Sequence, residues 1–394
     1  MTTYRPGRSL LLTLLSEACE LEHALACSYL FAAFSLKNGQ ADGLDWRQEQ
    51  QVKRWAAQVY FIAGQEMLHL AQAWNILNAV GGTPYFSRPP FPQPSDAFPV
   101  GVPLVLERYC RGTLERFKQW ERPVEVLSHR GFNAASTSGF YGNYGSVGEL
   151  YDKIAGLIAS MPERDLFVGH ADLQVDGALA DFPDLVRVVD RDTALRGVAR
   201  IQAQGEGSPL DREDCHFGLF CDLAGDLQNS QFDEIQLTAA HPTVPNPCVR
   251  PTIGGTRVLD SATLAAMRVF DSVYAAMLRL LGWVFGPAAP THPFTRRAAR
   301  ASIAAMPIVI KPLGEALAGL SSGLGDGTTA GAPFSSIRHL PLPTDPDLAQ
   351  RLSEERFGEL VDRAVSLLDD HPELDRTLRW LPGRLRAVED ILLG

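Results

Sequence analysis

Glu66-Met67-Leu68-His69 lies in a long apolar run of the sequence, and Glu22 lies in an earlier run of similar character. A carboxylate and an imidazole three residues apart project from one face of a helix. Four-helix bundles use such pairs, with glutamates from other helices, to hold two transition-metal ions in their core. The stretch therefore predicts a mainly α-helical bundle that binds metal.

Glu66 and His69 share a helical stripe with apolar residues, which is the face that a helix normally buries. These neighbours are Val59, Ile62, Ala63, Leu70 and Ala73. Burying a charged carboxylate without a partner costs several kcal/mol, and a bound metal ion removes that cost. The alternative is a core histidine that forms a hydrogen bond with the glutamate of the preceding turn.

The position of Glu22 favours the metal site over this alternative. Residues 11–37 predict one helix and residues 45–80 a second. In an antiparallel hairpin folded about residues 42–45, Glu22 and Glu66 each lie roughly six turns from the bend. The two carboxylates are therefore expected to meet.

The first helix also contains a rival pair, Glu20-x-x-His23. Glu22 shares its face with apolar residues, whereas Glu20 stacks with Glu17 and other polar or small residues. We therefore expect Glu22 to point inward and Glu17 and Glu20 to form a solvated face. His23 is left open between a position next to the metal ligands and the surface.

The composition is that of an ordinary globular protein. The chain has 394 residues, a hydrophobic content of 45% and a net charge of −10. The negative charge, and the lack of a basic stripe with interleaved aromatic residues, argue against a nucleic-acid partner. We expect a small-molecule or protein partner and leave a homo-oligomer open.

The cysteines and the N-terminus bear on the compartment. The six cysteines show neither a Cys-x-x-Cys zinc spacing nor the density of a disulfide framework. The apolar run Leu10–Leu15 is short and is soon interrupted by Glu17, so it predicts neither a signal peptide nor a membrane span. The sequence thus predicts a cytoplasmic protein without a membrane partner.

Further helices and long connections follow the hairpin. The pattern predicts a bundle over residues 1–235 and a C-terminal α-helical region packed on it over residues 236–394. Helices are expected near 104–119, 146–160, 193–204, from 211 onward, 261–285, 296–320 and 353–369. Long crossover loops are expected at 83–101 and 129–144, with a small hairpin at 161–190.

The third and fourth helices must supply the other metal ligands. Glu149 begins the third helix, but Ser146-x-x-Glu149 is also a capping box, in which the glutamate bonds to its own helix N-terminus. Glu206 ends the fourth helix and projects along its apolar face. Either Glu206 or Glu213 is a possible partner of His216, and their spacing does not decide between them.

Seven segments carry a resemblance to a known family. They are Glu20-Leu21-Glu22-His23-Ala24, Glu66-Met67-Leu68-His69-Leu70, Asn75-Ile76-Leu77-Asn78-Ala79-Val80-Gly81-Gly82-Thr83-Pro84, Gly148-Glu149-Leu150-Tyr151, Gln204-Gly205-Glu206-Gly207, Cys215-His216-Phe217 and Met306-Pro307-Ile308-Val309-Ile310-Lys311-Pro312-Leu313-Gly314. Over nearly the whole chain they resemble the ferritin-like family that includes the C-terminal part of iminophenyl-pyruvate dimer synthases. Those enzymes belong to bisindole pathways such as violacein and rebeccamycin biosynthesis.

The resemblance implies a ferritin-like four-helix bundle and a set of metal ligands. The implied ligands are Glu22, Glu66, His69, Glu149, Glu206 and His216. Carboxylate and imidazole ligands suit iron or manganese, whereas a soft-metal site would use thiolates. We therefore expect two transition-metal ions, either iron or an iron–manganese pair.

The leading hypothesis is a non-haem di-iron oxidoreductase that uses dioxygen or peroxide on a small organic, amino-acid-derived substrate. The loops at residues 85–99 and 131–145 are expected to shape its pocket. A metal storage or detoxification protein is one alternative. A non-catalytic scaffold, whose acidic residues simply pair in the core, is the other.

Overall fold

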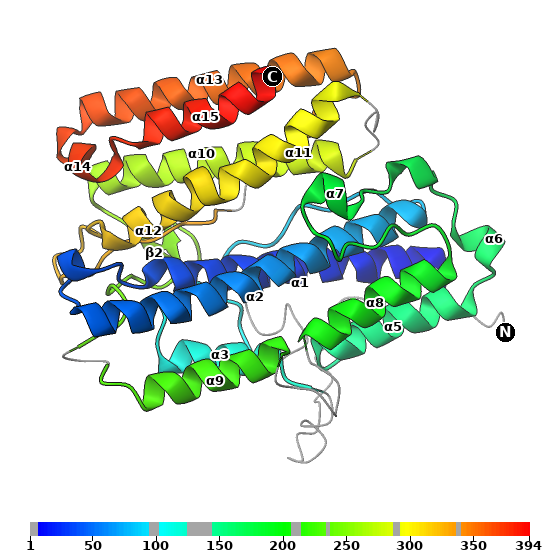
Figure 1. Ribbon diagram of the computed structural model, residues 1–394, viewed down its shortest axis with the longest axis horizontal. Helices are drawn as coiled ribbons and strands as arrows, with labels where there is room; N and C mark the ends of the chain where they lie inside the picture. The colour runs from blue at the N-terminus through cyan, green and yellow to red at the C-terminus, as the bar shows by residue number, and fades with distance from the viewer. Residues whose placement is uncertain are drawn as a thin grey trace.

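Two long antiparallel helices, α1 (Arg8–Ser35) and α2 (Trp46–Ala79), form the centre of the fold (Figure 1). The computed structural model describes residues 7–93, 102–123, 144–205, 214–233, 237–286, 292–335 and 340–394. The short helix η1 (Gln40–Asp42) lies in the connection between α1 and α2. Asp45 begins α2 with a capping box, because its side chain accepts from Gln48 N–H and the Gln48 side chain accepts from Asp45 N–H. The predicted hairpin is confirmed.

Four shorter helices cover one side of this hairpin. They are α3 (Arg111–Trp120), α5 (Val147–Ser160), α8 (Arg191–Gly205) and α9 (His216–Gln228). α5 packs on α8 and α3 packs on α9. In Figure 1 these two pairs follow one another along the hairpin, so that the ends of α3 and α8 lie near the starts of α5 and α9. The bundle's second layer is thus interrupted at mid-length, where α8 meets α9.

Residues 161–190 follow α5, and the small hairpin predicted there is wrong. The described chain forms α6 (Glu163–Leu166), η2 (Ala171–Leu173) and α7 (Gly177–Ala180) instead. Side chains of α2 satisfy its backbone: Asn75 donates to Val175 C=O at 2.8 Å, and Gln72 accepts from Val186 N–H at 2.9 Å. Amide side chains therefore replace the strand partner that the alternating apolar pattern had suggested.

The opposite side of the hairpin is covered by the C-terminal helices. They are α10 (Ser261–Val284), α11 (Pro293–Ala305), the π turn η3 (Met306–Ile310), α12 (Lys311–Gly319), α13 (Pro346–Asp370), η4 (Pro372–Leu374), α14 (Asp375–Leu378) and α15 (Leu381–Leu393). Two short parallel strands, β1 (Pro247–Cys248) and β2 (Thr256–Arg257), pair in the connection before α10. The mainly α-helical class is confirmed, although the sequence analysis did not predict α15.

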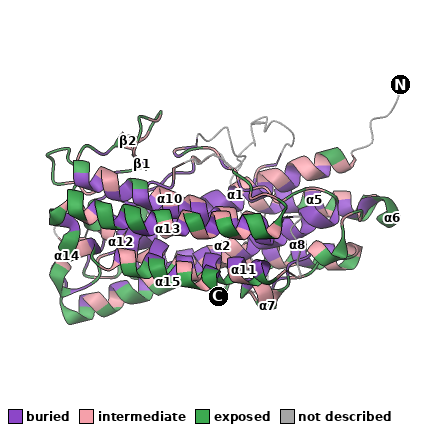
Figure 2. Ribbon diagram, turned by 90° about the horizontal axis from the view of Figure 1, so that it is seen from above, coloured by how far each residue is buried: buried purple, intermediate pink, exposed green. Residues whose placement is uncertain are grey.

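The hairpin is buried because it lies between these two layers. Figure 2 shows α1 and α2 largely buried, while α13 and α14 expose one side to solvent. One cluster of buried apolar side chains runs through both halves of the described chain. This shared core includes residues from both of the predicted regions, 1–235 and 236–394. The division of the chain between them stays a prediction.

The α11–η3–α12 segment is unusually apolar. Among the described residues, the helical stretch Pro293–Gly319 is long and apolar enough to cross a membrane by length and composition alone, and half of its most apolar window is buried in the protein. A core helix meets the same test, and this stretch contacts α1, α10 and α15. The cytoplasmic location stays a prediction from the sequence.

Candidate metal centre

Glu66, His69 and His216 converge in the core, where α9 begins against α2. One ligand atom from each lies within 4.8 Å of the others, and all three side chains are buried. His69 follows Glu66 by one helical turn, so both project from the same face of α2. His216 is the first residue of α9, and it reaches the cluster from the interrupted layer.

Glu66 lies between two similar groups of residues. On one side, His69 Nδ1 lies 3.5 Å from Glu66 Oε2 and 3.6 Å from Glu22 Oε2. On the other, His216 Nδ1 lies 2.7 Å from Glu66 Oε1 and 3.6 Å from Glu121 Oε2. The two imidazole rings stack with centroids 5.3 Å apart. Each histidine thus faces Glu66 and one further carboxylate.

The outer nitrogens of both histidines are held by glutamines. His69 Nε2 lies 3.0 Å from Gln204 Oε1, and His216 Nε2 lies 3.0 Å from Gln65 Oε1. Since an amide oxygen only accepts, each Nε2 must donate its proton. In the neutral imidazole this leaves a lone pair on Nδ1, aimed at the carboxylates, which is the orientation of a metal-binding histidine.

Two tyrosines hold the two outer carboxylates in the same manner. Tyr151 donates its hydroxyl proton to Glu22 Oε1 at 2.5 Å, and Tyr29 donates to Glu121 Oε1. Both hydroxyl groups are buried with the carboxylates that they bind. Each half of the centre therefore contains a histidine held by a glutamine and a glutamate held by a tyrosine.

The electrostatics of the cluster require positive charge between the carboxylates. Burial and the neighbouring Glu66 raise the pKa of Glu22 to about 8. Burial also acts to raise the pKa of Glu66, but His216, the hydrogen bond with Glu22 and His69 together hold it well below its usual value. Burial lowers the pKa of both histidines, yet the facing carboxylates outweigh it and raise the pKa of His69 well above its usual value and that of His216 to about 9.

These residues fit a metal ion. Two atoms that each lie about 2.1 Å from one transition-metal ion are about 3 to 3.5 Å from each other. The distances from His69 Nδ1 to Glu66 Oε2 and to Glu22 Oε2, 3.5 and 3.6 Å, are close to this value. Glu66 Oε1 and His216 Nδ1 are buried, and neither has an aligned hydrogen-bond partner among the described residues. A cavity of about 10 Å³ lies among Glu22, Glu66, His69 and Glu121, which is the size of one small guest. A cation there would bind the lone pairs that otherwise face one another.

The structure brings four of the six predicted ligands together, gives Glu149 other contacts and does not describe Glu206. Glu22, Glu66, His69 and His216 lie together in the cluster. The Glu149 carboxylate instead accepts from Gly145 N–H at 2.5 Å beside the start of α5, and Glu149 N–H donates to Ser146 Oγ at 3.1 Å. Ser146 thus caps α5, while the Glu149 side chain bonds to the residue before this cap and not to the Ser146 N–H of a complete capping box.

Glu206 and its rival Glu213 both lie outside the described residues. Their predicted pairing with His216 therefore stays a prediction. His23 is buried, so the surface position left open for it is wrong.

Glu121 was not predicted from the sequence, although this residue is only 3% exposed. It follows the last residue of α3, where the negative end of the helix dipole disfavours a carboxylate. It also continues the stripe of Leu114 and Phe117, two buried residues of α3. An acidic residue that both opposes the dipole and extends an apolar stripe was the available signal.

Comparison with known proteins adds a family and two relatives. Residues 15–224 match the family model described as Ferritin-like. The chain is 29% identical to the 2-imino-3-(indol-3-yl)propanoate dimerase of Chromobacterium violaceum, over 96% of this chain and 39% of that protein. It is 27% identical to the dichlorochromopyrrolate synthase of Lentzea aerocolonigenes, over 91% of this chain and 39% of that protein.

The chain thus spans well under half the length of these two relatives. A solved structure, a ferritin-like protein of Caulobacter vibrioides, is 18% identical to it with a TM-score of 0.49, and the match covers 82% of this chain and 97% of that one.

Proposed function

The chain belongs to the ferritin-like family, and from that premise we propose that it is a non-haem oxidoreductase with two metal ions, iron or an iron–manganese pair. We further propose that it acts on a small organic molecule derived from an amino acid. The observation that carries the proposal is the buried Glu66 carboxylate, which faces His69 with one oxygen and His216 with the other.

The paired construction of the centre supports two ions over one. Glu22 and His69 on one side of Glu66, and Glu121 and His216 on the other, would hold the ions together with Glu66. Ferritin-like bundles use a comparable set of glutamates and histidines from different helices. The two halves also have matching supports, a tyrosine on each outer glutamate and a glutamine on each histidine.

The donor set supports iron or manganese because it consists of carboxylate and imidazole groups without a thiolate. When bound, such a metal pair supplies redox chemistry toward dioxygen or peroxide. The protein's own contribution is to hold the ligands before the metal arrives. Gln204 and Gln65 fix the tautomer of the two histidines, while Tyr151 and Tyr29 orient the outer carboxylates and keep bulk water from them.

The class of substrate is supported by the two relatives. One is named for a compound with an imino acid and an indole group, and the other is named as a synthase of a dichlorinated chromopyrrolate. Both names denote small organic molecules, and the imino acid is a derivative of an amino acid. We carry over this class and not the dimerisation reaction.

The test is the metal content of protein purified from cells grown with added iron. We expect about two ions per chain in the wild type and almost none in Glu66→Ala, with unchanged helicity by circular dichroism. Glu17→Ala is the matched control, because Glu17 also lies in the hairpin but accepts a hydrogen bond from Tyr144, away from the cluster. We expect this control to keep both ions.

Two results would contradict the proposal. Many ions per chain would favour storage or detoxification, and the absence of metal in the wild type would favour a scaffold. Retention of stoichiometric iron by Glu66→Ala would remove Glu66 from the centre.

The Glu149→Ala variant decides between the two predicted roles of Glu149. If Glu149 only caps its helix, the variant keeps both ions, whereas if Glu149 is a ligand, the variant loses metal.

A further inference from the structure

A large cavity lies on the side of the α1–α2 hairpin opposite the metal centre. It has a volume of about 410 Å³, is partly open to solvent, and is lined by α1, α2, α10 and the α11–η3–α12 segment, with α7 at one end. In Figure 1 these C-terminal helices lie above the hairpin, while α3, α5, α8 and α9 lie below it. This volume lies in the range of sites that hold small organic molecules.

The residues of α2 that line the cavity alternate with those that face the metal centre. Tyr60, Gly64, Met67 and Ala71 follow one another at helical spacing along the cavity, whereas Glu66 and His69 point to the cluster. The cavity is therefore a separate space, and the proposed metal ligands do not line it.

The lining is apolar and rich in methionine and aromatic side chains. Aromatic and methionine residues from four elements contribute to it, among them Phe34, Trp74, Phe285, Met67, Met277 and Met306. Methionine adapts its shape to a guest and makes favourable contacts with aromatic rings. Along α2 the lining extends from Tyr60 to Trp74, which corresponds to a length of about 21 Å. The cavity is thus elongated as well as apolar.

One polar group of residues interrupts this lining midway along α1. Tyr274 OH lies 2.5 Å from His23 Nε2 and 3.2 Å from Cys27 Sγ, and all three residues line the cavity. These are hydrogen-bonding groups placed in an otherwise apolar surface. Such a group commonly fixes the orientation of a bound molecule.

The charged residues of the lining are at its ends. Lys311 is paired with Glu315 at 3.0 Å and lies over the Tyr60 ring, 4.9 Å from its centroid. Asp181 is exposed.

The middle of the described lining contains no charged residue. The buried guanidinium of Arg88 interacts with Tyr274 from outside the lining, and its charge also acts on Asp271. An anion placed against the apolar side chains would lose its hydration with little compensation.

The π turn η3 supports a binding role for this cavity. Met306, Pro307 and Ile310 of this turn line the space. Pro307 and Pro312 lack the N–H needed for helical hydrogen bonds, which accounts for a local departure from the α-helix. Such turns occur frequently at functional sites.

We propose that this cavity binds an elongated, neutral, apolar small molecule that carries one hydrogen-bonding group, which Tyr274 recognises. The site is distinct from the metal centre, and the proposal does not depend on the oxidoreductase function. The molecule lies along α1 and α2 with its polar group at Tyr274 and its body against the aromatic and methionine side chains.

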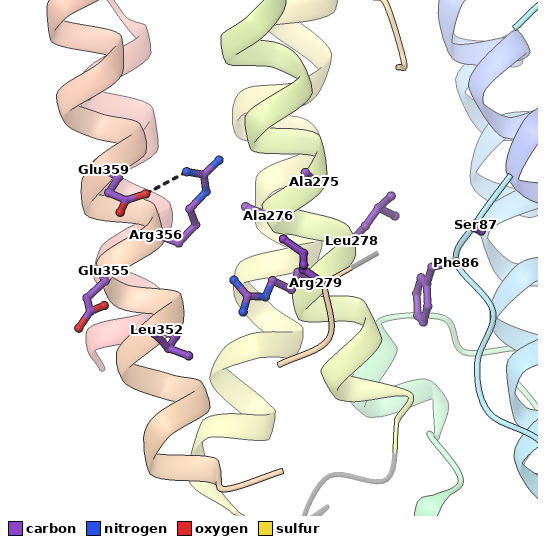
Figure 3. Close-up of a pocket in the computed structure, with 11 residues that line it drawn as sticks. Phe86, Ser87, Ala275, Ala276, Leu278, Arg279, Leu352, Glu355, Arg356 and Glu359 are labelled. Atoms are coloured by element: carbon purple, nitrogen blue, oxygen red, sulfur yellow. Dashed lines mark hydrogen bonds and ion pairs between the residues drawn. The ribbon is translucent and has the colours of Figure 1, made fainter. Parts of the chain in front are cut away.

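A second pocket of similar size gives a useful contrast. The groove between α10 and α13, of about 400 Å³, is lined by Arg279, Arg356, Glu355 and Glu359 as well as by apolar residues (Figure 3). Arg356 and Glu359 pair at 2.9 Å, and both glutamates are exposed. Its polar residues are thus of both signs and largely hydrated, so the groove does not select for an apolar guest.

The test uses two fluorescent probes that differ by one charged group. N-phenyl-1-naphthylamine is neutral, and 8-anilinonaphthalene-1-sulfonate carries a sulfonate on the same skeleton. We expect saturable binding of the neutral probe, with an affinity at least about tenfold higher than that of the sulfonate. The difference arises because the sulfonate must place its charge against an apolar lining. Equal or tighter binding of the sulfonate would overturn the neutral class.

The location is tested with Gly64→Leu. A Cβ at Gly64 meets no atom within 4 Å, and Gly64 lines the cavity, so a leucine side chain there would occupy part of it. Gly156→Leu is the matched control, because Gly156 is also helical with open space around its Cβ but lies on the exposed side of α5. We expect about tenfold weaker binding of the neutral probe in the first variant and an unchanged affinity in the second.

The polar contact is tested by competition between 1-dodecanol and the neutral probe. Tyr274→Phe is expected to lower the affinity for 1-dodecanol by roughly three- to tenfold, because one hydrogen bond is lost. The affinity for the neutral probe is expected to stay within about twofold of the wild-type value. Failure of the neutral probe to saturate the wild type, or full binding by Gly64→Leu, would overturn the site. An unchanged alcohol affinity in Tyr274→Phe would overturn the role of Tyr274.

Discussion

The two sides of the α1–α2 hairpin differ in what they enclose. The side toward α5, α8 and α9 holds three buried carboxylates and two buried imidazoles, with a space of about 10 Å³ beside Glu22, Glu66, His69 and Glu121. The side toward α10 and α12 holds an apolar cavity of about 410 Å³. Most of the α1 and α2 residues on both sides are buried, and both sides are built from residues that alternate along these two helices.

This difference shows that burial alone does not determine what a helix face can do. On the first side the outer nitrogens of both histidines and the two outer carboxylates each have a hydrogen-bond partner, whereas Glu66 Oε1 has none among the described residues. A central cation would complete this cluster. On the second side the packing is incomplete, since residues of α2, α10, α11 and η3 line an unfilled volume. One side holds a candidate metal centre and the other leaves room for a guest.

Removal of the metal is expected to have the largest effect on the first side. If the concentration of free metal is about a thousand times its Kd, metal binding contributes about 4 kcal/mol to the free energy of unfolding. Treatment of iron-loaded protein with a chelator should therefore lower its unfolding temperature, and added iron should restore it. Differential scanning calorimetry measures both steps. An unchanged unfolding temperature after complete iron removal would contradict a stabilising metal in this core.

The sequence predicted the centre of the first side because helical spacing is a local property. Glu66 and His69 lie one turn apart in any helix, and two apolar runs joined by a short break place Glu22 at the same height. Glu121 was missed because it reaches the cluster from a separate short helix. Nothing in the spacing within α3 indicates that His216 of α9 lies beside it.

The cavity of the second side was not predicted, although the helices at 261–285 and 296–320 that line it were. The apolar residues of α2, α10 and α11 indicate burial, but the same pattern describes a filled interface and a hollow one. The break in the last apolar run at Pro307 and Pro312 was visible in the sequence, which had suggested one continuous helix at 296–320. Whether such a break opens a cavity depends on tertiary packing.

A change of intermediate size is expected when one support of the centre is removed. Tyr151→Phe deletes the hydroxyl that donates to Glu22 Oε1 at 2.5 Å. Loss of such a support typically weakens metal affinity by about 10- to 100-fold. Competition with a chromogenic chelator measures this affinity. Tyr144→Phe is the matched control, since Tyr144 donates to Glu17 outside the cluster. Equal affinities in the two variants would show that Tyr151 does not support the centre.

A carboxylate on the second side shows the opposite electrostatic behaviour from Glu66. Burial raises the pKa of Asp271 to about 6, although its hydrogen bonds with Ser335 and the charge of Arg88 act to lower it. The folded protein therefore binds this proton more tightly than the unfolded chain, whose aspartate has a pKa near 3.9. Stability from this group is present at low pH and is lost as the pH rises through about 6.

Asp271→Asn removes this dependence. Because Asp271 is partly exposed to solvent, we expect the variant to gain about 2 kcal/mol at most over the wild type at pH 7, and to lose that advantage near pH 4. Urea unfolding at the two pH values measures the difference. A constant difference between the variant and the wild type at both pH values would refute the raised pKa.

The smallest expected effect comes from filling the cavity of the second side. Gly64→Leu should raise the free energy of unfolding by about 1 kcal/mol, because leucine favours the helix over glycine, with a further gain from apolar surface that it buries in the cavity. Gly156→Leu provides the helix contribution alone, since its side chain remains at the surface. Chemical unfolding of both variants therefore separates propensity from burial. If the two variants gain equally, the leucine at position 64 is not buried by the cavity. A larger gain for Gly64→Leu that disappears in the presence of N-phenyl-1-naphthylamine would mean that the probe and the leucine occupy the same space.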